Sequence, residues 1–387
     1  MVDGAPGPAL SALIFAVVTC AVATIYVTQP VLPALQAQFG ITVSTASLSV
    51  SAVIVGMAVT TLPIGMLVDR YPARPLMIAG ACVIAGAGAV CAATPSFAML
   101  VAMRTLQGAF IPTLTTCVAA WLARTLPTQA LNVAMGTYVS ATVAGGLGGR
   151  LLAGWAFPPA HWRHAFVAVG AALFVVTLLV APRLAETSPM RSVAPSTPLW
   201  RLVARRPQVL AQVAAFGAFG AFSTVFNYFP FYLSRPPWSL STPTITALYL
   251  VYVAGLVMGP FAGRLANRVG NGAVMIGGAL LLEVALAATL IVAIPALIAS
   301  LVCLCLGFFA IHAAAVGALN RSLSGERGKA NALYTLFYYL GGAAGIAAGG
   351  SLYARAGWPG IVGVSLALSL LPLGVGMIAS RRAVTHS

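Results

Sequence analysis

Three ionisable side chains lie inside long apolar stretches of this chain, where a charge is costly. Arg104, Glu283 and His312 are each surrounded in the sequence by mostly apolar residues. A charge in a hydrocarbon medium costs about 2.5–3.5 kcal/mol even on a lenient scale, so such residues tend to mark a pathway for a substrate, an ion or a proton. We therefore take these three as the first candidates for a binding or proton-transfer site.

Further polar residues accompany them at helical spacing. Gln107 lies one turn after Arg104, so the two side chains share a helix face. Arg150 lies near the end of its apolar stretch, and we expect it to extend to the membrane interface. Other side chains that could hydrogen-bond a ligand in an apolar wall, or serve the structure equally well, are Tyr26 and Gln29, one turn apart, and the neighbours Asn227 and Tyr228.

His312 and Glu283 each allow two interpretations. His312 could take up a proton or contact a substrate, since histidine titrates near neutral pH, or it could simply be hydrogen-bonded. Glu283 could be a proton site, but we favour a hydrogen bond to a neighbouring helix. The two residues can approach each other only if their helices pack face to face.

Twelve apolar stretches must position these residues. Of the 387 residues, 60% are hydrophobic and 6% are charged, whereas soluble globular proteins are about a quarter charged. A membrane-spanning helix needs about 20 mostly apolar residues, and the alternating polarity of a barrel strand is absent. We predict an all-α membrane protein with helices at residues 10–35, 45–67, 75–94, 97–122, 130–154, 164–182, 207–233, 244–264, 273–293, 297–320, 330–354 and 358–380.

The positive charges are distributed unevenly between the loops. If the gap between the second and third spans is cytoplasmic, fifteen Lys and Arg residues fall on the cytoplasmic side, and only Arg163, Arg235 and Arg355 fall on the other. The excess of basic residues in cytoplasmic loops then predicts that both termini are cytoplasmic. Because the net charge of +15 follows this pattern, we expect lipid and no nucleic acid as its partner.

The cysteines and the N-terminus show no sign of other chemistry. We expect the cysteines to act as small apolar packing residues, with no disulfide and no metal site. The first span is too long for a signal-peptide core, so we expect a retained helix. No ATP-binding loop of the Gly-x-x-x-x-Gly-Lys type is present, and we expect no cofactor. The cysteines are Cys20, Cys82, Cys91, Cys117, Cys303 and Cys305.

A basic, proline-containing gap divides the chain into halves. We predict a cytoplasmic linker at residues 183–206 between a six-helix bundle at residues 1–182 and a second bundle at residues 207–387. The end of the gap, residues 199–206, forms either a flexible linker or a short helix on the membrane surface, with Leu199, Leu202 and Val203 facing lipid and the arginines facing headgroups.

The two halves repeat each other weakly at a nearly constant offset. Gly65-Met-Leu-Val-Asp69-Arg70 matches Gly263-Arg-Leu-Ala-Asn267-Arg268 at an offset of 198. Gly145 and Gly149 match Gly345 and Gly349 at an offset of 200. Two six-helix halves of the same topology are the parallel repeat of transporters whose binding site lies at the interface of the repeats.

Several motifs are similar to those of a known family. They are Gly65-Met-Leu-Val-Asp69-Arg70-Tyr-Pro-Ala-Arg74 in the loop after the second span, and Arg104-Thr-Leu-Gln107-Gly108 in the fourth span. With them the chain resembles the major facilitator superfamily over its whole length. Tyr26-Val-Thr-Gln-Pro30, Gly148-Gly149-Arg150-Leu-Leu-Ala-Gly154 and Tyr338-Tyr339-Leu-Gly341 look like its acriflavine-sensitivity (YnfM-like) branch of bacterial efflux proteins.

Three departures from the family pattern affect the expected function. Pro72 stands where the loop signature usually has glycine, and the stretch from Ala144 to Gly149 lacks the proline of the antiporter signature. The fourth span ends at Arg124, where the family usually has an acidic residue nearby. The last two departures weaken the case for ordinary drug–proton exchange.

The resemblance implies roles for the polar and glycine residues. It places helices 1, 4, 7 and 10 around a central cavity that Arg104 would face; the alternative is that Arg104 ties helix 4 to backbone carbonyls of helix 1. Asp69 would lie near the start of helix 11 in a cytoplasmic gate made of Gly65, Asp69, Arg70, Arg74, Asn267 and Arg268. The glycines expected to let helices approach closely are Gly145, Gly149, Gly341, Gly345 and Gly349.

We therefore expect a monomeric secondary transporter of a bacterial inner membrane, which exports a small organic compound in exchange for protons by alternating access. A uniporter or symporter for a metabolite, such as an anion held by Arg104, is the alternative, because the first half has no acid within a span except Asp69 at a helix end. An enzyme has little support, since no nucleophile is paired with a base. A sensor of this fold usually carries a soluble signalling domain.

Overall fold

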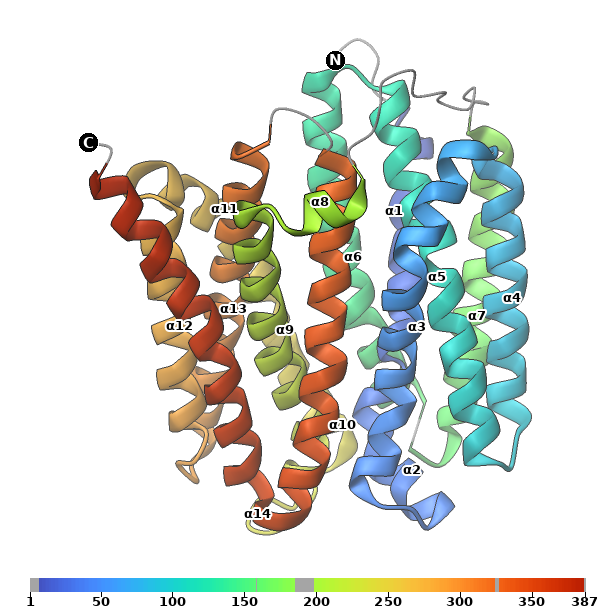
Figure 1. Ribbon diagram of the computed structural model, residues 1–387. Helices are drawn as coiled ribbons and strands as arrows, with labels where there is room; N and C mark the ends of the chain where they lie inside the picture. The colour runs from blue at the N-terminus through green and yellow to red at the C-terminus, as the bar shows by residue number, and fades with distance from the viewer. Residues whose placement is uncertain (1–6, 158, 185–197, 324–326, 386–387) are drawn as a thin grey trace. The chain divides into compact units, whose positions relative to one another are not determined.

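The computed structural model describes residues 7–157, 159–184, 198–323 and 327–385. Every regular element in these ranges is a helix (Figure 1). The chain divides into two compact units: unit 1 comprises Met1–Ile41 and Leu48–Val193, and unit 2 comprises Thr42–Ser47 and Ala194–Ser387. The predicted linker lies largely outside the described residues, and its role stays a prediction.

Unit 1 is built from long helices joined by short helical turns. The long helices are α1 (Pro8–Tyr26), α3 (Val43–Arg70), α4 (Ala73–Ala93), α5 (Phe97–Thr125), α6 (Thr128–Leu151) and α7 (Trp162–Val180). The short elements are η1 (Gln29–Val31), α2 (Leu32–Phe39), η2 (Leu152–Ala156), η3 (Pro159–His161) and η4 (Ala181–Arg183). The first predicted span is therefore broken into α1, η1 and α2.

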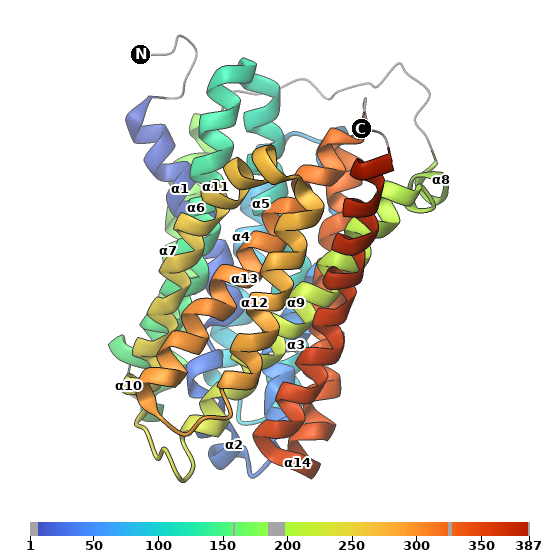
Figure 2. The ribbon, with the colours of Figure 1, turned by 90° about the vertical axis from the view of Figure 1, so that its left-hand side faces the viewer.

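Unit 2 ends in a long helical element with a sharp bend. Its elements are α8 (Leu199–Val203), α9 (Arg206–Leu233), α10 (Thr242–Leu248), η5 (Tyr249–Tyr252), α11 (Val253–Val269), α12 (Asn271–Ala288), α13 (Ile294–Arg321) and α14 (Arg327–Thr385). Gly357 in α14 has φ 60° and ψ −141°, a backbone conformation open to glycine because it has no Cβ. The bend gives α14 two legs (Figure 2).

Ten helices in the described ranges are long and apolar enough to cross a membrane. Nine of them correspond to single predicted spans, and the tenth, Gly328–Arg381, holds the last two spans on either side of Gly357. The remaining span is α6, whose 24 residues include several Thr, Ser and Gly that lower its hydropathy. The predicted all-α fold of twelve membrane helices is thereby confirmed.

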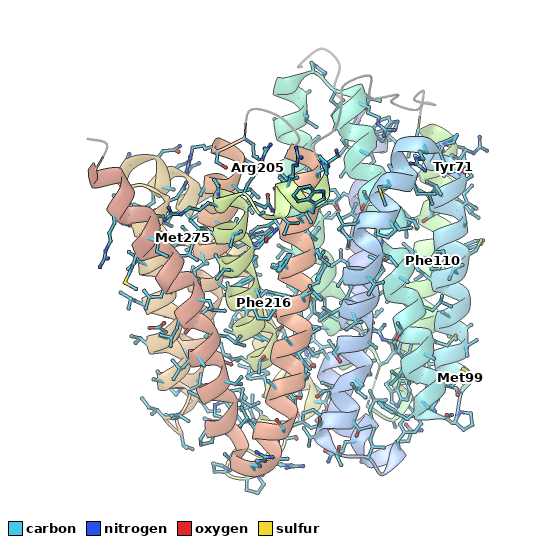
Figure 3. The ribbon with its side chains drawn as sticks, in the orientation of Figure 1. Tyr71, Met99, Phe110, Arg205, Phe216 and Met275 are labelled. Atoms are coloured by element: carbon cyan, nitrogen blue, oxygen red, sulfur yellow. The ribbon has the colours of Figure 1, made fainter. Side chains whose placement is uncertain are left out.

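Local signals explain where the helices of unit 1 begin and end. The Ser96 hydroxyl accepts a hydrogen bond from the backbone N–H of Met99 at 3.4 Å, which satisfies one free donor in the first turn of α5. Pro72 separates α3 from α4, because proline is poorly accommodated inside a helix. Figure 3 shows Tyr71, just after α3, and Met99 at opposite ends of unit 1. Successive helices therefore run in opposite directions.

Glycines allow two equivalent helix pairs to pack closely. A Cβ on Gly149 would lie 2.2 Å from the carbonyl oxygen of Ala23, so α6 reaches α1 this closely only with glycine there. A Cβ on Gly341 would lie 2.1 Å from the carbonyl oxygen of Phe216, where the first leg of α14 meets α9 (Figures 2 and 3). Gly145 and Gly345 also face backbone carbonyls closely, whereas a Cβ on Gly349 would meet the side chains of Tyr228 and Thr224.

The short helix expected near residue 200 is present as α8, but its contacts differ from the expectation. Leu202 is 0% exposed, because it packs where α8 meets α9 and α14. The prediction that Leu202 faces lipid is therefore wrong. Trp200 is instead 68% exposed, with the guanidinium of Arg201 4.9 Å from its ring centroid. Arg205 follows at the junction of α8 and α9 (Figure 3).

Candidate functional site

Arg104 lies fully buried at the centre of unit 1, where its donors reach backbone carbonyls of two other helices. Its Nε donates to the carbonyl of Ser49 in α3 at 2.8 Å. Its Nη1 donates to the carbonyl of Thr24 at 2.7 Å, and its Nη2 to that of Ile25 at 2.6 Å. Thr24 and Ile25 belong to the last turn of α1, whose carbonyls have no helical N–H to accept from. The arginine therefore caps the end of α1.

Gln107 extends this network to a fourth helix. Its Oε1 accepts from Nη1 of Arg104 at 2.9 Å, and its Nε2 donates to the carbonyl of Ile84 in α4 at 3.1 Å. The Phe166 ring of α7 lies 5.5 Å from the Arg104 guanidinium. One pair of side chains on α5 thus connects α1, α3 and α4. This geometry fits the alternative in which Arg104 ties its own helix to backbone carbonyls of the first helix, which we call the helix tie. An anion-binding role for Arg104 stays a prediction.

Arg150 forms a second buried cluster in unit 1 with two predicted site residues. It is 1% exposed, so the expectation that it extends to the membrane interface is wrong. Its Nε donates to Oε1 of Gln29 at 2.6 Å and its Nη1 to the carbonyl of Gly146 at 2.6 Å. The guanidinium lies 3.9 Å from the ring centroid of Tyr26. Tyr26 and Gln29 therefore stabilise a buried cation where α1 meets α6.

His312 of α13 is hydrogen-bonded to the first leg of α14. Its Nδ1 lies 2.9 Å from the hydroxyl oxygen of Tyr334, which is buried. The His312 ring is also 5.5 Å from that of Tyr338 and 6.1 Å from that of Phe308, centroid to centroid. A hydroxyl on one ring nitrogen leaves the other nitrogen as a separate proton site. The arrangement can bind and release a proton, and that role stays a prediction.

Unit 2 contains a continuous aromatic cluster around His312. Phe219 stacks on Tyr338 with centroids 3.7 Å apart, and Phe222 stacks on Phe308 with centroids 4.0 Å apart. Aromatic faces at these distances give a wall suited to flat apolar groups. The members of the aromatic cluster, as used below, are Phe219, Phe222, Phe308, His312, Tyr334 and Tyr338.

Asn227 and Tyr228, neighbours in α9, have different environments. The Tyr228 hydroxyl donates to the carbonyl of Ile346 in α14 at 2.7 Å, which is a helix contact. Asn227 is 0% exposed, yet neither its Oδ1 nor its Nδ2 has a hydrogen-bond partner among the described residues. A buried polar group without a partner costs about 1–3 kcal/mol. Of the predicted site residues, Asn227 therefore offers free bonding capacity to a ligand.

Glu283 of α12 is bonded to the second leg of α14. Its Oε1 accepts a hydrogen bond from the Ser369 hydroxyl at 3.1 Å. The hydrogen-bond partner of His312 is Tyr334, so the two ionisable residues contact different legs of α14. This is the contact with a neighbouring helix that we favoured, and a proton-carrying role for Glu283 stays a prediction.

The predicted gate residues lie at helix ends of both units. The side chain of Asp69 lies outside the described residues, so its contact with helix 11 stays a prediction. Asn267 accepts from Nη1 of Arg321 at 3.2 Å, and Nη2 of Arg124 donates to the carbonyl of Val68 at 3.2 Å. Each unit thus has an arginine at the end of a long helix, α5 or α13, that bonds the last turn of another helix, α3 or α11. Exposed gate residues are Arg70, Arg74 and Arg268, and a Cβ on Gly65 would meet nothing within 4 Å.

Sequence reasoning missed the aromatic cluster. Tyr334 and Tyr338 are four residues apart and so share a face of α14. Phe219 and Phe222 are three apart on α9 with the same consequence. These spacings are visible in the sequence, but aromatic stripes are common on packed helices. The contact between Tyr334 and His312 joins residues on different helices, which no local spacing indicates.

Comparisons with known proteins agree with this architecture. A model of the Major Facilitator Superfamily matches residues 14–257 and 238–382. The inner membrane transport protein YnfM of Escherichia coli (strain K12) is 29% identical over 366 residues, covering 93% of this chain and 88% of that protein. A chloramphenicol resistance protein of Streptomyces lividans is 33% identical over 161 residues, which is 40% of each chain.

The fold is also found in a solved structure. A bacterial homologue of the human lysosomal transporter Spinster, in an inward-facing and unoccupied conformation, matches with a TM-score of 0.78, at 16% identity over 96% of both chains. At this identity the match supports the fold alone. The family model covers nearly all twelve helices, including the Arg104–Gln107 pair and the His312 region. The chain therefore belongs to the Major Facilitator Superfamily of secondary transporters, which work by alternating access.

Proposed function

We propose that this transporter exports small organic compounds with aromatic groups across a bacterial inner membrane in exchange for protons. Alternating access would arise from rocking of the bundles at residues 1–182 and 207–387 against each other. The unequal distribution of arginines supports cytoplasmic termini, and the similarity to an inner membrane transport protein and to a chloramphenicol resistance protein supports the membrane and the direction. The protein acts as a monomer.

The observation that carries the substrate class is Asn227. It is a buried amide with both polar atoms unpartnered among the described residues. It lies on α9, the helix that supplies Phe219 and Phe222 to the aromatic cluster. An apolar site with a few polar groups that set orientation is typical of small-molecule binding. We infer a compound with an aromatic ring and a hydroxyl or amide group that Asn227 hydrogen-bonds.

The proton is assigned to His312, with Glu283 as the second candidate. The hydroxyl of Tyr334 fixes the orientation of the imidazole, and its apolar aromatic surroundings in unit 2 limit other proton exchange. Glu283 is bonded to Ser369, so it has a structural role whether or not it carries a proton.

The alternative is transport of an anion bound to Arg104 without proton coupling. It has less support, because the Arg104 guanidinium donates to three backbone carbonyls and to Gln107. An anion there would have to displace bonds that hold α1, α3 and α5 together. The ring faces of the aromatic cluster stack on one another, so an aromatic compound there would replace one ring contact by another and would break no hydrogen bond to a backbone carbonyl.

The test uses the full chain in proteoliposomes with an acidic interior. Radiolabelled chloramphenicol and a panel of small aromatic antibiotics are added outside, and their accumulation is followed with and without a protonophore. We expect accumulation that collapses with the protonophore for at least one compound. Asn227→Leu should reduce it strongly, whereas Gln36→Leu in α2 serves as a control that should transport normally. Uptake that only equilibrates and ignores the protonophore would contradict the proposal and favour a uniporter.

A further inference from the structure

A series of buried and half-buried polar side chains lies in unit 2 between its arginine-rich end and His312. The arginine-rich end is where α9 begins at Arg206 and α13 ends at Arg321. The polar file, as we name it, consists of Asn320 on α13, Asn331 and Tyr334 on α14, and Gln208 and Gln212 on α9. The two members on α14 are three residues apart and the two on α9 are four apart, so each pair shares one helix face.

The outer members of the polar file join the helices through amide hydrogen bonds. Nδ2 of Asn331 donates to Oδ1 of Asn320 at 2.9 Å, and Nδ2 of Asn320 approaches Oδ1 of Asn331 at 3.4 Å. Nε2 of Gln208 donates to the carbonyl of Ala330 at 3.0 Å. Hydrogen bonds from α9 and from α13 therefore reach neighbouring residues of α14, Ala330 and Asn331, at this end of unit 2.

The α9 members continue deeper, to the level of Tyr334. The helices α9 and the first leg of α14 run in parallel, because residues 122, 119 and 118 apart are bonded at Gln208, Ser223 and Tyr228 in turn. With the offset of 122 seen at Gln208, Gln212 lies level with Tyr334. Tyr334 in turn bonds Nδ1 of His312. The polar file thus leads from the arginine-rich end to His312.

The two glutamines retain bonding capacity that the described protein does not use. Gln208 is 1% exposed and its Oε1 has no partner, and Gln212 is 3% exposed and its Nε2 has no partner, among the described residues. If these positions served only to pack the helices, apolar side chains would do so without the cost of about 1–3 kcal/mol for an unsatisfied amide. A buried acceptor and a buried donor one turn apart are the partners that a water molecule needs.

We propose that the polar file carries water from the arginine-rich end of unit 2 to His312, and that His312 exchanges its coupled proton by this route. The inference rests on the proposed proton coupling for its purpose, but the water route can be tested without transport. The proposed route of the proton meets the proposed site of the organic compound at Tyr334 and His312, which belong to both the polar file and the aromatic cluster.

The proton passes to His312 through the hydroxyl of Tyr334, along two successive hydrogen bonds. In the neutral imidazole that accepts from Tyr334 at Nδ1, the hydrogen is on Nε2. A hydronium ion in the polar file gives its proton to the Tyr334 oxygen while the Tyr334 O–H bond breaks and an N–H bond forms at Nδ1. The products are water, neutral tyrosine and imidazolium. Release of the proton is the reverse.

Among the described residues, few other ionisable groups are in contact with His312. In hydrogen-bond or ring contact with it, the described residues provide Tyr334 and Tyr338 from α14 and the apolar ring of Phe308 from its own helix. From α12, Glu283 is bonded to Ser369. The aromatic rings of α9 carry no charge. The protonation of His312 therefore depends on the water that reaches it along the polar file.

The experiment measures exchange of the imidazole Cε1 hydrogen for deuterium by mass spectrometry, on the full chain in proteoliposomes in D2O. This exchange needs water at the ring and depends on the protonation state of the histidine. His161 and His164, which are exposed at the start of α7, are internal references in the same molecule. The variants are Gln208→Met, Gln212→Met and the double variant, which keep side-chain length and remove the amides. Gln36→Met is the matched control.

We expect measurable exchange at His312 in the unaltered protein. In the double variant it should slow roughly tenfold, the ratio given by a loss of about 1.4 kcal/mol in water binding. His161 and His164 should exchange at unchanged rates in every variant, which shows that the exchange conditions are the same, and unfolding of unit 2 would speed exchange at His312 rather than slow it. Unaltered exchange at His312 in the double variant, or no exchange in the unaltered protein, overturns the polar file. Accumulation of compounds without proton coupling would instead contradict the proposed function and leave this result standing.

Discussion

Nη2 of Arg104 donates to the carbonyl oxygen of Ile25 at 2.6 Å, and Ile25 is the residue before the last of α1. Helix α1 ends at Tyr26 in the apolar part of the chain, where water is not at hand to satisfy its last carbonyls. A cation at the C-terminal end of a helix also interacts favourably with the helix dipole. Arg104 thus makes an internal helix end possible.

The first prediction concerns replacement of Arg104. Arg104→Ala should leave the carbonyls of Thr24 and Ile25 unsatisfied at about 1–3 kcal/mol each. We expect lower thermal stability in detergent together with lost transport. Arg104→Lys should restore only part of both, because one ammonium cannot span carbonyls on α1 and α3 as a planar fork does. Normal stability of Arg104→Ala would contradict the helix tie and return Arg104 to substrate binding.

The second prediction separates the ring from the hydroxyl at Tyr26. The Arg150 guanidinium lies over the Tyr26 ring at 3.9 Å, a contact worth up to about 2 kcal/mol when desolvated. Tyr26→Phe keeps the ring and loses only the hydroxyl that bonds Arg150, so it should lower the thermal stability less than Tyr26→Leu, which loses both. The measurement is the melting temperature of the purified variants. Equal loss in both would assign the effect to the hydroxyl instead.

The sequence predicts the helices of unit 1 well and the partners of its arginines poorly. The faces shared by Arg104 and Gln107 follow from helical periodicity. The carbonyls that Arg104 contacts exist because the first apolar stretch breaks after Tyr26, and we predicted one span over 10–35. Pro30 and Pro33 were the available signal, since neither can donate an N–H to a helix. Because hydropathy is averaged over a whole span, it does not reveal a break within one. The end of α1 at Tyr26 is therefore not predicted.

Arg150 shows the same limit for long-range contacts. Its position near the end of an apolar stretch predicted a side chain that reaches the interface. The structure buries it instead, because Gln29 and Tyr26, more than a hundred residues earlier, lie beside it. Local spacing shows which residues share one helix face, whereas the pairing of faces depends on how helices pack. Asn227 is the reverse case: its position was foreseen, but its unpartnered amide could be recognised only in the packed unit.

The third prediction tests which ionisable residue couples protons. His312→Gln should remove the dependence of net transport on a pH gradient while substrate exchange continues, because exchange needs no net proton movement. Glu283→Gln keeps an oxygen acceptor for the Ser369 hydroxyl and should retain coupling. The measurement is gradient-driven accumulation compared with counterflow in the same proteoliposomes. Coupling that survives in both single variants and in the double variant would exclude both residues.

The fourth prediction concerns orientation. The distribution of arginines predicts that the gap at residues 183–206 is cytoplasmic and that the loop containing Ser239 is on the other side. Single cysteines at Ser192 and at Ser239, in a variant without native cysteines, should react with an impermeant thiol reagent from opposite sides of intact cells and inverted vesicles. Labelling of both from the outside would contradict the orientation.

The last prediction tests the glycine contact between α9 and α14. A Cβ on Gly345 would lie 2.4 Å from Oγ1 of Thr224 and 2.5 Å from the carbonyl oxygen of Gly220, so any larger side chain must separate the helices. Ala344, the preceding residue, is exposed and provides a matched control. Gly345→Leu should therefore lower the melting temperature and the yield of monodisperse protein, whereas Ala344→Leu should change neither.

The contact at Gly345 also affects the position of the aromatic residues of α9. The same helix face that meets Gly345 fixes the rotation of α9, and with it the stacking of Phe219 on Tyr338 at 3.7 Å. Overpacking of a tight contact typically costs about 1–3 kcal/mol, enough to shift α9 without unfolding unit 2. Gly345→Ala, the smallest enlargement, should therefore alter transport of aromatic compounds at temperatures where the fold is intact. Unchanged transport and stability in both Gly345 variants would show that α9 and α14 are not held together at this point.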